Sequence, residues 1–69
     1  MTFTIARHET QKHQVTITQD KYSTLYHVSL LEMMDACRAR EVNRNSYTTK
    51  AKAQQRFNYL KRQVKKMEG

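Results

Sequence analysis

The chain has 69 residues, of which 38% are hydrophobic, and its 13 lysines and arginines against six acidic residues give a formal net charge of +7. A chain this short forms one domain with a small core, and no window approaches the roughly 18 apolar residues of a membrane span. The single cysteine, Cys37, excludes an internal disulfide, so we expect a reducing compartment, the cytoplasm. Because the core is small, a homodimer is also possible, since it would extend the core.

Two stretches near the amino terminus alternate apolar and polar side chains, as half-buried strands do. The first strand is predicted from about residue 2 to about residue 8, through Phe3 and Ile5. The second is predicted from about residue 13 to about residue 19. Val15 and Ile17 are expected to face the core, while threonines, which favour pleated surfaces, take the other side.

A third strand is predicted from about residue 22 to about residue 30. The residues before it, Gln19 to Lys21, are polar and include an aspartate that can bond its own backbone. This pattern indicates a tight turn, and therefore a hairpin between the second and third strands. Tyr26 and Val28 are the expected core residues of the third strand.

The stretch from about residue 31 to about residue 41 allows two interpretations. Four positions at helical spacing favour a short helix, in which the thiol packs as a small apolar group. They are Leu30, Met33 or Met34, Cys37 and Glu41. In the alternative interpretation the third strand continues, and a fourth strand returns through Val42 to Tyr47. The polar run 43–46 indicates a loop in either case.

A long helix is predicted from about residue 49 to about residue 67. Its apolar residues recur every three or four positions and form one stripe: Ala53, Phe57, Leu60, Val64 and Met67. Thr48 or Thr49 can cap its start. The predicted fold class is therefore α+β, a small antiparallel sheet of three strands, or four, packed by one long C-terminal helix.

Almost all of the net charge belongs to this helix. Residues 1–49 contain six cations and five acidic residues, a net charge of +1, whereas residues 50–69 contain seven cations against Glu68 alone, a net charge of +6. A polyanion is the natural complement of such a surface.

We expect the helix to bind the phosphate backbone of DNA or RNA, with weak or no reading of bases. The predicted binding residues are Lys52, Arg56, Tyr59, Lys61, Arg62, Lys65 and Lys66. Most of them fall on one side of the helix, where the tyrosine ring can stack on a base. Lys61 and Lys65 form a second, smaller row. This interpretation predicts a small accessory protein that binds nucleic acid.

Two other interpretations of the same residues stay open. Basic residues suit the negative end of a helix, so the cations can be an ordinary solvated face. The near absence of acidic residues argues against this, because solvated helices usually mix both signs. Alternatively, the protein is an interaction module or inhibitor whose helix docks on an acidic protein surface. An edge strand, or Met33 and Met34, would extend that contact.

Catalysis, bound metals and cofactors are not expected. The sequence has no glycine-rich phosphate loop, nucleophile elbow or paired metal-ligand spacing. His8, His13 and His27 could approach one another across a hairpin, but an outer sheet face is the simpler place for His27. Three carboxylates near the middle of the chain are expected to pair locally with Arg38 and Arg40. They are Glu32, Asp35 and Glu41.

Overall fold

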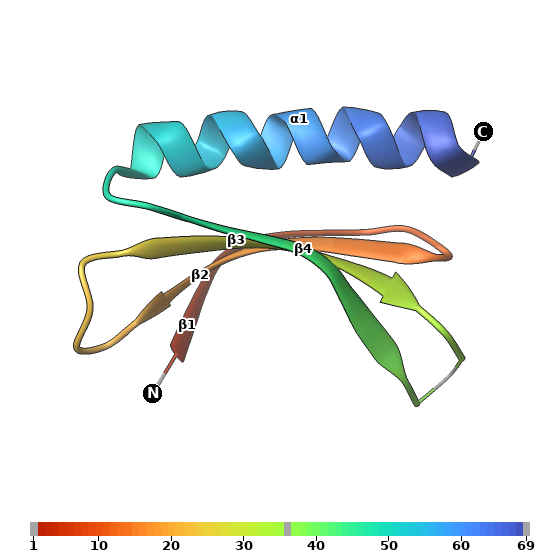
Figure 1. Ribbon diagram of the computed structural model, residues 1–69, viewed down its shortest axis with the longest axis horizontal. Coiled ribbons are helices and arrows are strands. Elements are labelled where there is room, and N and C mark those ends of the chain that lie inside the picture. The colour runs from red at the N-terminus through yellow and green to blue at the C-terminus, as the bar shows by residue number, and fades with distance from the viewer. Residues whose placement is uncertain (1, 36, 69) are drawn as a thin grey trace.

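The computed structural model describes residues 2–35 and 37–68. Within these residues the element order is β1 (Thr2–Glu9), β2 (His13–Asp20), β3 (Tyr26–Met33), β4 (Ala39–Tyr47) and α1 (Lys50–Glu68). The strands form one antiparallel sheet in the order β1-β2-β3-β4, and α1 lies along one face of it (Figure 1). The predicted α+β class is confirmed, in its four-stranded form.

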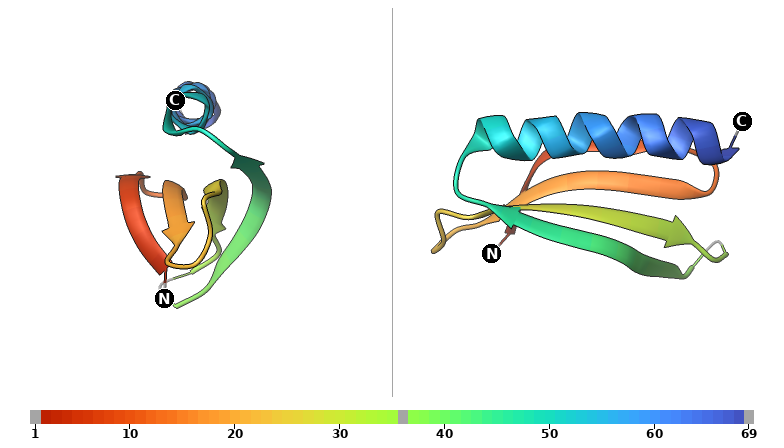
Figure 2. Two further views of the ribbon diagram at one scale, coloured as in Figure 1. Left: turned by 90° about the vertical axis from the view of Figure 1, so that its left-hand side faces the viewer. Right: turned by 45° about the horizontal axis from the view of Figure 1, so that its top comes forward.

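One apolar layer between α1 and the sheet forms the core. The sheet contributes Val15 and Ile17 from β2 and Val28 and Leu30 from β3, all on the face that α1 covers. The helix contributes Ala53, Phe57, Leu60 and Val64. The end-on view shows why these residues meet, because α1 sits above the two middle strands (Figure 2, left). Side-chain periods of two in the strands and 3.6 in the helix give each element one apolar face.

The helix is found almost where the sequence predicts it. Thr49 caps its first turn, with its hydroxyl oxygen accepting the backbone N–H of Lys52 at 3.3 Å. Met67, predicted as the last residue of the apolar stripe, is instead 57% exposed. At this end the helix reaches the β1–β2 turn, and Glu68 rather than Met67 makes the contact with it.

The third strand begins four residues later than predicted, at Tyr26. Two side chains hold the preceding segment in turns, because Asp20 accepts the backbone N–H of Tyr22 and Ser23 accepts that of Leu25, each at 3.1 Å. These bonds compete with a sheet ladder for the same backbone groups. Tyr22 is consequently 85% exposed, whereas Val28 is fully buried, as expected, and Tyr26 packs against the core.

The expected short helix at about residues 31–41 is wrong, and the alternative interpretation is confirmed. β3 continues to Met33, whose backbone N–H donates to the carbonyl of Lys12 at 2.7 Å. The chain then turns at Asp35, whose carboxylate accepts the backbone N–H groups of Cys37 and Arg38, each at 2.8 Å. Cys37 is therefore exposed in a turn and does not pack among apolar neighbours.

The polar run 43–46, predicted to be a loop, lies inside β4. Asn43 and Asn45 face the helix side opposite Leu30 and Val28, and the amide of Asn45 donates to the side-chain oxygen of Asn43 at 2.7 Å. Residues of low strand propensity are held here by the ladder to β3. Each edge strand also contains a bulge, at Ile5 in β1 and at Val42 in β4, which adds local twist.

Candidate functional site

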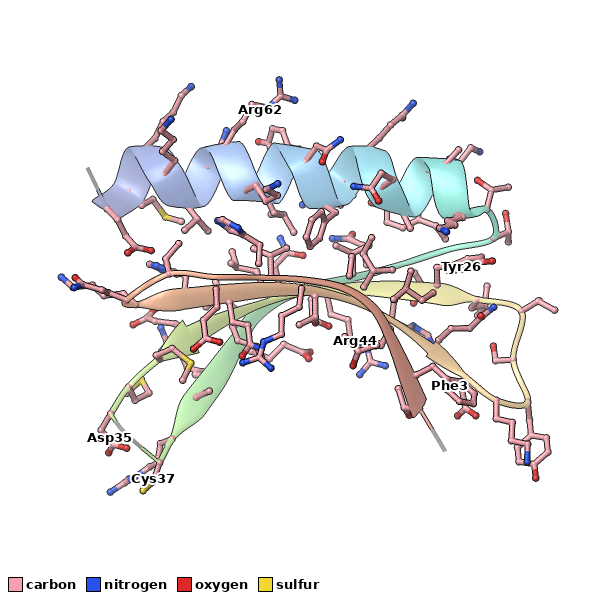
Figure 3. The ribbon with its side chains drawn as sticks, turned by 180° about the vertical axis from the view of Figure 1, so that it is seen from behind. Phe3, Tyr26, Asp35, Cys37, Arg44 and Arg62 are labelled. Carbon is pink, nitrogen blue, oxygen red and sulfur yellow. The ribbon has the colours of Figure 1, made fainter. Side chains whose placement is uncertain are left out.

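The cations of α1 project from the faces that the sheet leaves uncovered. Among the predicted binding residues, the exposed ones are Lys52, Tyr59, Arg62, Lys65 and Lys66, and the half-buried ones are Arg56 and Lys61. Arg62 points away from the sheet (Figure 3). The apolar stripe thus fixes the helix on the sheet and directs its charges outward.

These residues lie on two flanks of α1. Lys61 and Lys65 face β1, because they line a groove together with His8 of that strand. At 100° per residue, Lys52 and Arg56 fall on the opposite flank, toward β4. The two rows of cations expected from the sequence therefore lie toward opposite edges of the sheet.

Tyr59 and Arg56 interact with each other. The guanidinium carbon of Arg56 lies 4.9 Å from the centroid of the Tyr59 ring, a cation–π geometry. Arg56 Nε is buried and has no hydrogen-bond partner in the described part of the chain. One face of the ring predicted to stack on a base is thus covered by a side chain of the same helix.

The distribution of ion pairs explains why the uncompensated positive charge of the protein lies on α1. Of the three carboxylates expected to pair with Arg38 and Arg40, Asp35 pairs with Arg38 at 3.4 Å and Glu32 with Arg40 at 3.1 Å, whereas Glu41 forms no ion pair in the described residues; Arg7 pairs with Glu9. Within residues 2–35 and 37–68, no ion pair involves a lysine or arginine of α1. Acidic residues of the sheet and its turns neutralise cations of the sheet and turns, whereas the cations of the helix stay uncompensated.

Glu68, the one acidic residue of α1, is held by the β1–β2 turn. Its carboxylate accepts hydrogen bonds from the Thr10 hydroxyl and from His13 Nδ1, the latter at 2.8 Å. These bonds, with the nearby His13, hold the pKa of Glu68 below its ordinary value, although partial desolvation opposes the shift. Because its negative charge is directed toward the turn, Glu68 compensates little of the helix charge.

A groove of about 500 Å³ separates the last turns of α1 from the end of β1. We call it the α1–β1 groove; its lining residues are His8, Thr10, Lys61, Arg62, Val64, Lys65 and Glu68. Sequence reasoning selected the three cations and missed the partners from the strand side. His8 and Thr10 are far from the helix in the chain, and the fold brings the end of β1 and the β1–β2 turn beside it.

A second groove, of about 480 Å³, lies at the same end of the sheet. Its lining includes Met33, half-buried, and Met34, which is 58% exposed. Glu9, Gln11, Lys12 and Asp35 complete it. The two methionines considered as an adaptable contact are therefore outside the core and accessible.

The helix-free face of the sheet is polar. One cross-strand row consists of Arg7, Thr16, Ser29 and Arg44, each opposite the next. Arg44 points away from the helix (Figure 3). Because the sequence predicts a loop at 43–46, it does not place Arg44 on a face of the sheet. The alternation of Asn43, Asn45 and Tyr47 with Arg44 and Ser46 nevertheless has the period of a strand.

The histidines do not converge. His8 and His13 lie on the helix side of the sheet, opposite Val15 and Glu32, whereas His27 lies on the helix-free face, as expected, and bonds Ser46 Oγ at 2.8 Å. In the described ranges no three His, Cys, Asp or Glu side chains are grouped to hold a metal ion. Nor do these ranges contain a helix with the length and apolarity needed to cross a bilayer.

No family model, curated protein or solved structure matches the chain. The geometry of the site is therefore the basis for a functional proposal.

Proposed function

We propose that this protein is a small accessory protein that binds nucleic acid through contacts between α1 and the phosphate backbone. The observation that supports the proposal is the set of seven cations on α1, none of which is in an ion pair in the described residues. Uncompensated like charges repel one another, so they suggest selection for a polyanion.

The chemistry of the helix fits backbone contact better than base reading. Lysines and arginines that neutralise phosphates release condensed counterions, which provides affinity that is independent of sequence. Both DNA and RNA supply this backbone. The exposed free thiol of Cys37 fits a reducing compartment, and we propose the cytoplasm as the place of action.

Two charge-matched triple variants test the proposal. Lys52, Arg62 and Lys66 are exposed on α1, and Lys12, Lys21 and Arg44 are exposed on the sheet and its turns. Glutamine at either set lowers the net charge from +7 to +4. Arg56 is left unchanged because it is half-buried against Tyr59.

Binding is measured by fluorescence anisotropy with labelled duplex DNA, single-stranded DNA and RNA. The helix variant should lose tenfold to about a hundredfold in affinity, because each exposed contact contributes up to ~1 kcal/mol. The sheet variant should change affinity only a few-fold, since solvent and salt screen distant charges. Equal losses in the two variants would contradict a helix surface.

A second candidate function is suggested by the accessible Met33 and Met34. Methionine repacks readily against varied partners, so the protein could instead be an interaction module that binds an acidic protein surface. Recovery of one stoichiometric partner from nuclease-treated extract, together with no binding in the anisotropy assay, would favour this function. Loss of the partner on nuclease treatment would exclude it.

A further inference from the structure

The α1–β1 groove combines an apolar wall with cations in one concave surface. Val64 lies behind this surface and is fully buried, so it supports the groove without being accessible to a ligand. Lys61 and Lys65, which flank Val64 on the helix, present long aliphatic stems as well as charge to the groove. With a volume of about 500 Å³, the groove is as large as typical small-ligand sites.

The charges of the groove are predominantly positive. Lys61, Arg62 and Lys65 supply them from α1, and the imidazole of His8 lines the groove from β1. The Lys61 ammonium lies 5.5 Å from the centroid of the Phe57 ring, a cation–π contact within the helix. The carboxylate of Glu68 is already bonded by Thr10 and His13. An anion with an apolar part is the complementary ligand.

A nucleotide of an unpaired strand has this combination of properties. In a duplex the bases are stacked inside and the phosphates follow a convex surface, which does not enter a groove. In a single strand the sugar and base are free to leave the stack and contact protein beside their phosphate.

We propose that the α1–β1 groove binds one nucleotide unit of a single-stranded nucleic acid, with its phosphate at the charged groups of Lys61, Arg62 and Lys65 and its sugar and base against the aliphatic stems of the two lysines. This inference rests on the proposed function of α1 and adds to it a preference for unpaired strands and a position for one nucleotide.

Two charge-matched double variants test the groove. Lys61 and Lys65 are replaced by glutamine in one, and Lys52 and Lys66, which are outside the groove, in the other. Each lowers the net charge from +7 to +5. Labelled eight-nucleotide strands of thymidine or uridine, and a duplex DNA of the same length, are the probes, and circular dichroism checks that both variants remain folded.

The groove variant should bind the single strands about tenfold more weakly than the flank variant does. Its salt dependence should also fall, by up to about 0.7 in slope, because the groove is proposed to neutralise one phosphate of the strand. On the duplex the two variants should behave alike. The unmodified protein should bind the single strands more tightly than the duplex.

Nuclear magnetic resonance of the unmodified chain gives a readout that needs no mutation. Addition of the thymidine strand should shift the backbone amide signals of His8 and Thr10 and the His8 imidazole, which line the groove from the strand side. The signals of Lys61 and Lys65 should shift at the same time. All of these shifts should be larger than those of Lys52 and Lys66.

The outcomes separate this inference from the proposed function. Three results would each overturn nucleotide binding in the groove but leave the proposed contact between α1 and the phosphate backbone intact. They are equal weakening by both double variants, unshifted signals of His8 and Thr10, and duplex binding as tight as single-strand binding. Absence of binding to every probe would overturn both.

Discussion

Individual buried residues matter strongly in this molecule because its core contains so few of them. Ile17, Val15, Val28 and Val64 are its largest completely buried side chains. A domain of this size buries a smaller fraction of its surface than a large one does, so its folding free energy depends on each contact. Truncation of one core residue should therefore approach the whole margin of stability.

At Ile17, which lies on β2 beneath α1, removal of one methyl group gives a graded test. Ile17→Val should lower the free energy of unfolding by about 0.5–1.5 kcal/mol, and Leu60→Ala by about 2–5 kcal/mol, because each leaves a cavity. Val42→Ala is the control, since Val42 is 50% exposed. Urea unfolding should show the control within about 0.5 kcal/mol of the unmodified protein; a core variant as mild as the control would contradict this core.

At the scale of elements, the helix was predictable because local signals agree. A threonine cap, a three-four apolar spacing and the absence of glycine or proline all indicate the same segment. Thr49 supplies the cap through its bond to the Lys52 N–H. The helix therefore starts at Lys50, one residue from the prediction.

The neighbouring threonines test this cap. Thr49→Ala should destabilise the protein by about 1 kcal/mol, the usual contribution of a threonine cap. Thr48→Ala is its matched control, because Thr48 has no side-chain hydrogen bond among those of the described residues. Thermal unfolding should separate the two variants, and an equal loss of stability in both would argue against Thr49 as the cap.

β4 was not predicted with the same success because its stability is not local. Asparagines and serine at 43–46 favour turns, and the strand exists through pairing with β3. The methionines Met33 and Met34 fit a helical period equally well, and only the Asp35 turn ends β3. Sequence periodicity cannot rank such alternatives when tertiary pairing decides between them.

The end of α1 is joined to the β1–β2 turn through Glu68, which makes a pH-dependent contribution. Its pKa is lowered from 4.5 by the Thr10 hydrogen bond first and then by His13. Folding thus favours the carboxylate, so the added stability is complete above about pH 4.5 and is lost as the pH falls through the lowered pKa.

Glu68→Gln should therefore be less stable than the unmodified protein near neutral pH, and the difference should shrink as the pH falls well below about 4.5. Glu41→Gln is the control, since Glu41 is exposed and forms no ion pair in the described part of the chain. Urea unfolding of the three proteins across this pH range measures the effect. A difference that stays constant with pH would contradict the Thr10–His13–Glu68 contact.

For the whole molecule, the uneven charge was evident from the sequence, but its arrangement was not. Counting residues locates six of the seven net charges in 50–69. Only the fold shows that Lys61 and Lys65 share a groove with His8, that Arg56 covers Tyr59, and that sheet cations pair with sheet carboxylates. These contacts join residues far apart in the chain, and no local pattern records them.

The salt dependence of binding tests the proposed helix surface most directly. The dissociation constant of the unmodified protein for a labelled single strand is measured by anisotropy across a salt series from about 50 mM upward. A linear fall of log affinity with log salt, with a slope of about −2.8 or steeper, would correspond to four or more neutralised phosphates, as we predict. No binding at the lowest salt, or binding that is indifferent to salt, would contradict it.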